Sequence, residues 1–279
     1  MKQGILYLLS GVGYAELLAV SLFTLRKHYS GAVHVFVTDD ASEAAVNRMQ
    51  ADASITVSRI PLPSVRRHHS YCVKATLPAL SPFKRSVFLD ADTLVCGDIG
   101  ELFGSCLAVT RFSDWVTTGK TISKRIRQWG GGSKWGSMSP AVDGLIAHAL
   151  AESRPAVNTG IFGFHRDCPI LPQWEALTLA GWQRSFTDEL AMQLLWEHQP
   201  GARIFDDRWN ASPVYSAGRQ DVRVWHLHGR AHARKDAGRA LWLPVFEEAI
   251  SVNFAGLVDW SGDFDAAVKL MRSGQHAAA

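Results

Sequence analysis

Short apolar runs alternate with longer amphipathic stretches along the first part of the chain. The apolar runs predict strands at residues 4–9, 33–38, 55–60 and 86–89. The stretches between them predict helices at residues 14–28, 41–50 and 70–80. Strands that alternate with helices favour an α/β fold whose sheet is built from right-handed crossovers.

The pattern changes in the middle of the chain. Residues 113–140 combine a basic run with Gly130-Gly-Gly and several tryptophans, among them Trp115, Trp129 and Trp135, which is typical of a mobile loop or lid. Beyond it, a strand is predicted at 157–164, helices at 169–181 and 188–198, and a short strand at 222–225. We therefore expect one domain over residues 1–240, followed by a helical extension over 241–279 with a frayed end.

Composition limits the classes of function. The chain has 279 residues, of which 47% are hydrophobic and 20% charged, so it can bury a full core and is not a disordered chain. A net charge of +3 suits an acidic small molecule but not a nucleic acid. The four cysteines show no C-x-x-C spacing, and no apolar run is long enough to cross a membrane. We expect a cytoplasmic protein without a transmembrane segment; peripheral membrane contact and the oligomeric state stay open.

Two carboxylates, Asp90 and Asp92, follow the apolar strand Val87-Phe-Leu89. Such neighbours repel each other unless a cation lies between them, and their oxygens suit Mg²⁺, Mn²⁺ or Ca²⁺. The carboxyl end of a strand is also where open α/β sheets bind ligands. The pair predicts a divalent metal that holds phosphates, although two acidic residues can also simply form a turn.

The residues around this pair resemble a known family. Lys74 lies on the preceding predicted helix, and Gly97-Asp-Ile-Gly-Glu-Leu-Phe103 follows the Asp-x-Asp strand. Together they resemble glycosyltransferase family 8, the retaining enzymes that include glycogenin and bacterial lipopolysaccharide galactosyl- and glucosyltransferases. The resemblance implies a single GT-A-type, Rossmann-like α/β domain with a mixed, mostly parallel central sheet flanked by helices.

A turn follows the first predicted strand, in Leu8-Leu-Ser10-Gly-Val-Gly-Tyr14. Glu16 occupies the third glycine position of a dinucleotide fingerprint, which weakens that interpretation. In the resembled family this turn cradles uridine, with Ser10 at a hydroxyl position and Tyr14 stacked on the base. Gly11 replaces an asparagine that the family often has. The alternative is a simple strand-to-helix turn with Tyr14 in the core.

Two later segments resemble the donor-sugar motifs of the family. Val157-Asn-Thr-Gly160 resembles its N-[ST]-G strand, which supplies Asn158 and backbone groups to the sugar. Thr187-Asp-Glu-Leu-Ala191 stands where the family begins a helix with D-Q, so Glu189 replaces a glutamine. Thr187 is a candidate N-cap, which would leave Asp188 facing the sugar.

The last motif is Val224-Trp-His226-Leu-His228-Gly229-Arg230, which resembles the family's H-x-x-G. The register makes His226 the third metal ligand and His228 its neighbour. The phosphate contact is left open between Arg230, His232, Arg234 and Lys235. Trp209-Asn210 resembles a W-N stretch before this motif, which we expect to be structural.

The resemblance therefore implies a hexosyltransferase that uses Mn²⁺ or Mg²⁺, a UDP-sugar donor (UDP-glucose or UDP-galactose) and a saccharide or other hydroxyl acceptor. The expected metal ligands are Asp90, Asp92 and His226, and the expected catalytic residues are Asp188 and Lys74. The expected donor-binding residues are Leu8, Ser10, Tyr14, Lys74, Asp90, Ala91, Asp92, Asn158, Gly160, Asp188, Glu189, Gly229 and Arg230.

Two alternatives stay open. A haloacid-dehalogenase-like phosphatase also carries Asp-x-Asp after an apolar strand, but it needs a threonine at the position of Leu94. A catalytically silent nucleotide-sugar-binding protein of the same fold is the other, and Gly11 and Glu189 are the departures that favour it.

Overall fold

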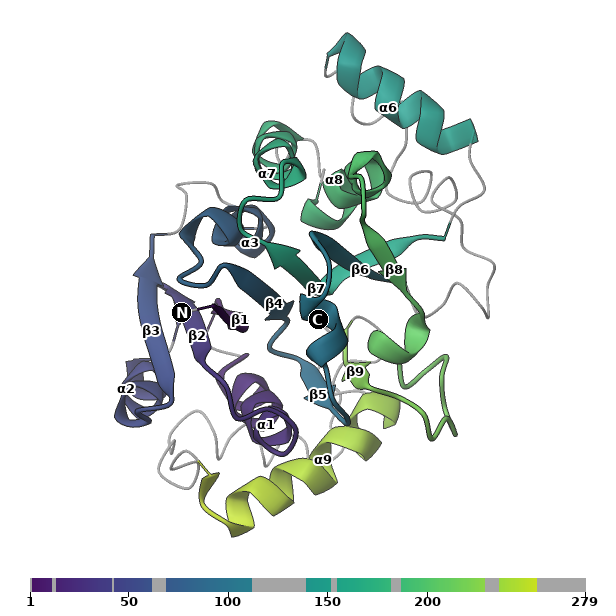
Figure 1. Ribbon diagram of the computed structural model, residues 1–279. Helices are drawn as coiled ribbons and strands as arrows, with labels where there is room; N and C mark the ends of the chain where they lie inside the picture. The colour runs from purple at the N-terminus through teal and green to yellow at the C-terminus, as the bar shows by residue number, and fades with distance from the viewer. Residues whose placement is uncertain are drawn as a thin grey trace.

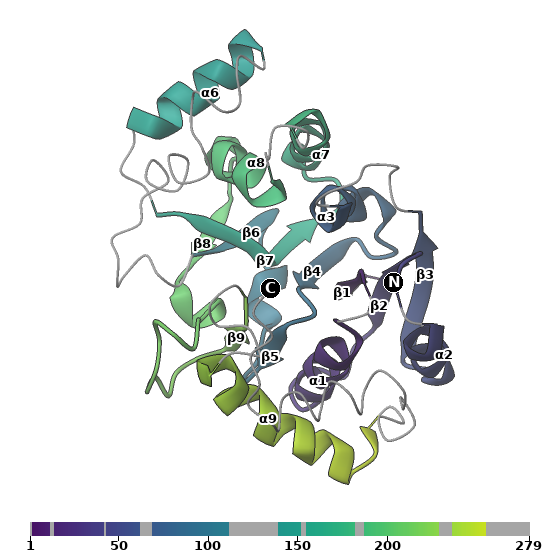
Figure 2. The ribbon, with the colours of Figure 1, turned by 180° about the vertical axis from the view of Figure 1, so that it is seen from behind.

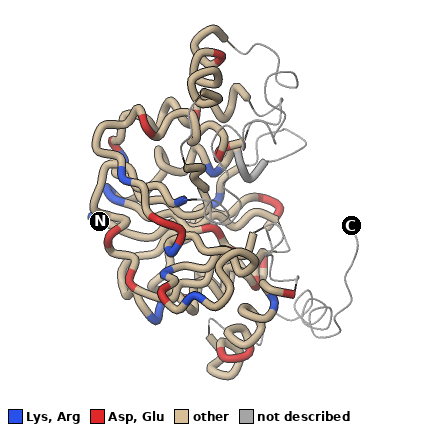
Figure 3. The backbone as a smooth tube through the Cα atoms, turned by 90° about the vertical axis from the view of Figure 1, so that its right-hand side faces the viewer, with Lys and Arg blue, Asp and Glu red and all other residues tan. Residues whose placement is uncertain are grey.

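The computed structural model describes residues 2–11, 14–41, 43–61, 69–111, 139–151, 155–181, 187–228 and 236–254. The predicted loop over 113–140 lies outside these residues up to position 138, as do Gly229, Arg230 and residues 255–279. In Figure 3, acidic and basic positions are intermixed along the described chain.

A seven-stranded sheet in the order β3-β2-β1-β4-β7-β6-β8 forms the centre of the molecule (Figure 1). Its strands are β1 (Gln3–Leu9), β2 (Val33–Thr38), β3 (Ile55–Ile60), β4 (Arg85–Leu89), β6 (Leu107–Arg111), β7 (Val157–His165) and β8 (Arg203–Phe205). All neighbouring pairs are parallel except those of β7, which runs antiparallel to both β4 and β6. The expected mixed, mostly parallel sheet is confirmed.

Helices cover both faces of this sheet (Figures 1 and 2). They are α1 (Ala15–Arg26), α2 (Glu43–Ala51), α3 (His69–Leu80), α6 (Pro140–Ala151), α7 (Ile170–Gly181), α8 (Asp188–Leu195) and α9 (Asp236–Ser251). Successive strand side chains point to opposite faces, so Tyr7 and Leu9 pack in the core beneath α1 and α9, whereas Leu6 and Leu8 pack in the core beneath α3, α7 and α8. Strands covered on both faces explain the unbroken apolar runs in the sequence.

Several predicted boundaries are wrong. Helix α8 ends at Leu195, and the 3₁₀ turn η4 (Trp196–His198) completes the segment predicted as one helix, because helix ends often tighten in this way. The strand predicted at 222–225 is β9 (Val224–His226), so His226 ends the strand rather than following it. Strands β5 (Thr93–Val95), β6 and β8 were not predicted, and the expected loop at 113–140 gives way to α6 at Pro140.

The C-terminal helix α9 packs on the domain core. Trp242 and Phe246 are fully buried in the same cluster as α1, and Lys27 at the end of α1 pairs with Glu248 at 2.7 Å. The division of the chain at residue 240 stays a prediction. Among the described residues, no helix combines the length and apolarity that crossing a membrane requires.

Candidate active site

The carboxyl end of β4 brings distant parts of the chain together. The backbone N–H of Asp90 donates to the carbonyl of Gly160 on β7 at 2.7 Å, which antiparallel pairing of β4 and β7 makes possible. The Thr93 hydroxyl donates to the Asp90 carbonyl at 2.8 Å and closes the turn that carries Asp92. Strand β5 then pairs antiparallel with β9, which places His226 opposite Thr93. Backbone pairing therefore positions both aspartates and the histidine.

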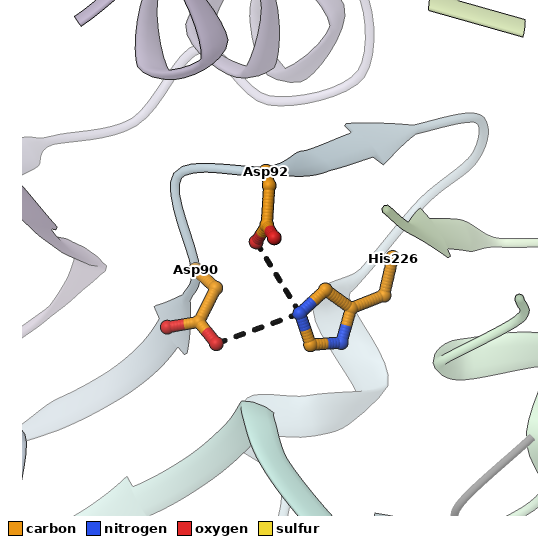
Figure 4. Close-up of side chains that lie close together, drawn as sticks. All are labelled: Asp90, Asp92 and His226. Carbon is orange, nitrogen blue, oxygen red and sulfur yellow. Dashed lines mark ion pairs between the residues drawn. The ribbon is translucent and has the colours of Figure 1, made fainter. Parts of the chain in front are cut away.

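These three side chains converge on one point, as Figure 4 shows. Nε2 of His226 lies 3.5 Å from Oδ2 of Asp90 and 3.3 Å from Oδ1 of Asp92. One ligand atom from each residue lies within 4.8 Å of the others, and the group does not include His228. Two carboxylates and an imidazole are a donor set that suits Mn²⁺ or Mg²⁺. The residues predicted to bind the metal are thus adjacent and fit such an ion, while their ligand role stays a prediction.

The three groups perturb one another's protonation. Burial lowers the pKa of His226, but the carboxylates of Asp92 and Asp90 outweigh it and raise this pKa to about 9. Burial raises the pKa of Asp90, yet Lys74 and His226 bring it down to about 2. The pKa of Asp92 is lowered too, because His226 outweighs the effect of burial. Both carboxylates are therefore ionised at neutral pH and available to a cation.

Lys74 lies between two carboxylates. Its Nζ atom is 2.8 Å from Oδ1 and 3.0 Å from Oδ2 of Asp90, and 3.6 Å from Oδ2 of Asp188. The side chain is buried, with its ammonium 5.2 Å from the centre of the Phe88 ring. A buried cation between two acids neutralises charge that could not otherwise be buried. Lys74 thus connects the two acidic groups of the site.

Asp188 is buried at the start of α8. Thr187 caps this helix, accepting from the N–H of Leu190 at 3.2 Å, as predicted. The Asp188 carboxylate is therefore free of the capping role, and its Oδ2 accepts from the Thr159 hydroxyl at 2.7 Å. Among the described residues, its Oδ1 atom is buried with no hydrogen-bond partner. Burial raises the pKa of Asp188 even though Lys74 opposes this.

Asn158, Gly160 and Glu189 lie beside the metal group. The Asn158 amide donates to Oε2 of Glu189 at 2.6 Å. A Cβ atom at Gly160 would lie 2.1 Å from Cε1 of His226, so the histidine ring packs directly on the Gly160 backbone. Sequence reasoning missed that Asn210 accepts from Nδ1 of His226 at 2.9 Å. The Trp209-Asn210 motif was visible in the sequence, but only the fold shows this contact.

The β1–α1 turn lies at the same edge of the sheet. Leu8 is buried within β1, Ser10 follows the strand, and Gly11 has a φ of +80°, which favours glycine. Its N–H donates to Oδ1 of Asp40, after β2, at 3.0 Å. Tyr14 is 41% exposed, so the alternative that placed it in the core is wrong. An exposed aromatic side chain therefore lies at this turn, and its stacking on a base stays a prediction.

Three predicted donor-binding residues remain: Ala91, Gly229 and Arg230. Ala91 is buried between the two aspartates of the metal group. Gly229 and Arg230 lie outside the described residues, as do the phosphate candidates His232, Arg234 and Lys235.

Known structures share this architecture. LgtC, a galactosyltransferase solved with donor and acceptor sugar analogs, is 16% identical, with 91% of this chain and 95% of that chain covered and a TM-score of 0.58. The chain has the GT-A fold. A glutamine-to-glutamate active-site mutant of LgtC gives 15% identity, coverage of 88% and 95%, and a TM-score of 0.55. The bifunctional glycosyltransferase WbbM gives 15% identity and a TM-score of 0.58 over 82% of this chain, which spans only 46% of WbbM.

The likeness in fold is not accompanied by a match over the whole sequence. No protein-family model matches the chain, and no curated protein matches it in sequence. The GT-A fold is therefore established by the arrangement of the backbone, and the predicted fold class is confirmed.

Proposed function

We propose that this protein is a metal-dependent retaining glycosyltransferase. It would move a hexose from a nucleotide diphosphate sugar, UDP-glucose or UDP-galactose, to a hydroxyl of a saccharide or another acceptor. The observation that carries the proposal is the group of Asp90, Asp92 and His226 at the carboxyl end of β4 in a GT-A fold. The likeness to LgtC, whose structure holds donor and acceptor sugar analogs, supports a site for both substrates.

The chemistry of the site suits departure of a diphosphate. Asp90, Asp92 and His226 would hold Mn²⁺ or Mg²⁺, and the bound ion would neutralise charge on the leaving diphosphate as a Lewis acid. Lys74 adds a fixed positive charge from α3 in a buried setting, where electrostatic stabilisation is strongest. These residues would stabilise the developing negative charge while the sugar becomes oxocarbenium-like.

The residues around Asp188 would bind the sugar. Thr159 and Lys74 hold one of its oxygens, and the other is buried without a partner among the described residues. That oxygen is available to a sugar hydroxyl, which supports a positioning role for Asp188 over covalent attack. Glu189 stands where the resembled family has glutamine, and a glutamine-to-glutamate change has been made in the active site of LgtC. The 2.6 Å hydrogen bond from Asn158 to Glu189 supports the assignment of both residues to the same subsite.

The nucleoside would bind at the β1–α1 turn, where Ser10, the backbone beside Leu8 and the exposed ring of Tyr14 lie at one edge of the sheet. A cytoplasmic location stays a prediction, and the diphosphate contact stays open between Arg230, His232, Arg234 and Lys235.

The first test is thermal unfolding with Mn²⁺, UDP, or both. A ligand at about 100 times its dissociation constant stabilises a protein by about 2.7 kcal/mol. For a domain of this size each kcal/mol raises Tm by about 2–4 °C. We expect a rise of about 5 °C or more with both ligands, which Asp92→Asn and His226→Gln abolish. Matched controls are Asp98→Asn, at an exposed carboxylate, and His34→Gln, at a buried histidine on β2; both should keep the shift.

Turnover separates the enzyme from a silent binding protein. We expect Mn²⁺-dependent release of UDP from UDP-glucose or UDP-galactose, and retention of anomeric configuration when an acceptor is found. Binding of Mn²⁺ and UDP without release of UDP from any UDP-sugar would favour the binding protein that Gly11 and Glu189 leave open. The absence of a shift with every nucleotide would overturn both. The phosphatase alternative is disfavoured, because the chain has the GT-A fold of LgtC.

A further inference from the structure

A continuous chain of buried hydrogen bonds connects Glu189 on α8 to His226 on β9. The Asn158 amide donates to Oε2 of Glu189 at 2.6 Å, and Asn210 donates from Nδ2 to Oδ1 of Asn158 at 3.0 Å. Oδ1 of Asn210 lies 2.9 Å from Nδ1 of His226. All four side chains are buried. The chain thus crosses from the residues assigned to the donor sugar to those assigned to the metal.

The direction of these hydrogen bonds is set by the backbone N–H of Gly160, which can only donate. Asn158 must therefore turn its Oδ1 toward that N–H and its Nδ2 toward Glu189. Its Oδ1 then accepts from the N–H of Gly160 at 2.8 Å and from Asn210. Asn210 must therefore present Oδ1 to the histidine, and the ring must donate through Nδ1. The remaining ring nitrogen, Nε2, is the atom that faces Asp90 and Asp92.

We propose that Asn210 is the positioning residue of His226, and that Asn158, held by the N–H of Gly160 and by Glu189, fixes the orientation of Asn210. Because Asn210 accepts the proton on Nδ1, Nε2 is the nitrogen whose proton a divalent cation would replace and whose lone pair it would take. This inference rests on the proposed function, because the cation is the one expected at that site. Partners that orient a ligating histidine commonly change metal affinity by about 10–100-fold when they are removed.

A second contact holds Asn210 in the same direction. The Thr110 hydroxyl donates to the carbonyl of Ile161 at 2.9 Å, so it accepts from Nδ2 of Asn210 at 2.8 Å. Glu189 accepts from Asn158 at the far end of the relay, and the Oε1 atom of a glutamine could accept in the same way.

The experiment measures the affinity for Mn²⁺ by calorimetry at saturating UDP. UDP lacks the hexose of the donor, so contacts of Glu189 with that hexose do not enter the measurement. We expect Asn210→Leu to weaken Mn²⁺ binding by about 10–100-fold, and Asn210→Asp, which still accepts from Nδ1, to recover part of the loss. Glu189→Gln keeps the shape of the side chain, and we expect a smaller loss from it.

Two comparisons separate positioning from a purely structural role. Gln193→Met is the matched control, because Gln193 is a buried side chain on α8 that donates to the carbonyl of Val157 and, within the described part of the chain, forms no hydrogen bond with a side chain of the relay. It should lower Tm without changing Mn²⁺ affinity. In a His226→Ala background, Asn210→Leu should cause no further loss of Mn²⁺ affinity, since residues that act through one another are not additive.

The outcomes are distinct. If the unmodified protein binds neither Mn²⁺ nor UDP, the proposed function fails and the relay fails with it. If the unmodified protein binds both, but Asn210→Leu binds Mn²⁺ as tightly as it does, the relay alone is overturned. Should Asn210→Leu not fold, unchanged affinity in Asn210→Ser, whose shorter side chain cannot reach Nδ1 of His226, still overturns the role of the relay.

Discussion

Gly160 and His226 are in direct contact: the imidazole ring occupies the space that a side chain at position 160 would take. A Cβ atom there would lie 2.1 Å from Cε1 and 2.7 Å from Nδ1 of the ring. The carbonyl of Gly160 also accepts from the N–H of Asp90. The glycine is required for close approach, and it joins the histidine to the Asp-x-Asp turn.

Replacing this glycine should disable the metal site. We expect Gly160→Ala to displace His226, to abolish the Tm shift with Mn²⁺ and UDP, and to lower the free energy of unfolding by about 1–3 kcal/mol through overpacking. Thermal and urea unfolding measure both effects. Gly144→Ala on α6 is the control, because no described atom outside its own turn of the helix lies within 4 Å of a Cβ there. A Gly160→Ala variant that binds normally would show that the ring is not held as described.

Removing the charge of Lys74 should destabilise the protein. Lys74→Met leaves the buried Asp188 without its cation and the partly buried Asp90 with His226 alone, and breaking a buried ion pair commonly costs about 3–5 kcal/mol. We expect Mn²⁺ to recover part of this loss, since it would bind to Asp90. The control is Lys27→Met, at an exposed pair with Glu248, which should cost about 0–1 kcal/mol. Equal losses from both variants would contradict the role assigned to Lys74.

The stability of the metal-free protein should depend on pH on both sides of neutrality. The pKa of His226 is raised from 6.5 to about 9, so its contribution is complete below pH 6.5 and disappears as the pH rises through 9. The pKa of Asp90 is lowered from 3.8 to about 2, so its contribution is present above pH 3.8 and disappears as the pH falls toward 2. One proton changes stability by at most about 1.4 kcal/mol per pH unit.

Urea unfolding with a chelator present, from pH 5 to pH 10, measures the alkaline side. We expect the decline between pH 6.5 and 9 to be absent in His226→Gln, which has no titrating ring. His34→Gln should retain it. An unchanged decline in His226→Gln would assign the titration to another group.

The N-cap of α8 should affect stability more than binding. Thr187→Ala removes the bond to Leu190 and should cost about 1 kcal/mol, whereas Thr187→Ser should restore it. We expect binding of Mn²⁺ and UDP to persist, because Asp188 stays with Thr159 and Lys74. Full stability together with reduced turnover of a UDP-sugar would mean that Asp188 had taken over the cap.

The longer elements could be predicted because their residues repeat a clear pattern. Strands β2 and β3 begin and end where the apolar runs do. Strands β5 and β8 have only three residues each, which is too short for an alternation of apolar and polar residues to be recognised. Strand β6 ends next to the Gly-rich stretch and was not distinguished from it. Helix α6 is apolar on several sides and gave no amphipathic signal.

The sequence alone was enough to single out the candidate site residues: the aspartates after a buried strand, the basic residue on the helix before it, and the histidine near the end of the domain. Local spacing and residue type contain that information. Only the tertiary structure decided that β7 runs antiparallel, that Gly160 lies under His226, and that Asn210 joins Asn158 to the ring. These contacts join residues far apart in the chain, and their partners are chosen by the packing of the sheet rather than by any neighbour in sequence.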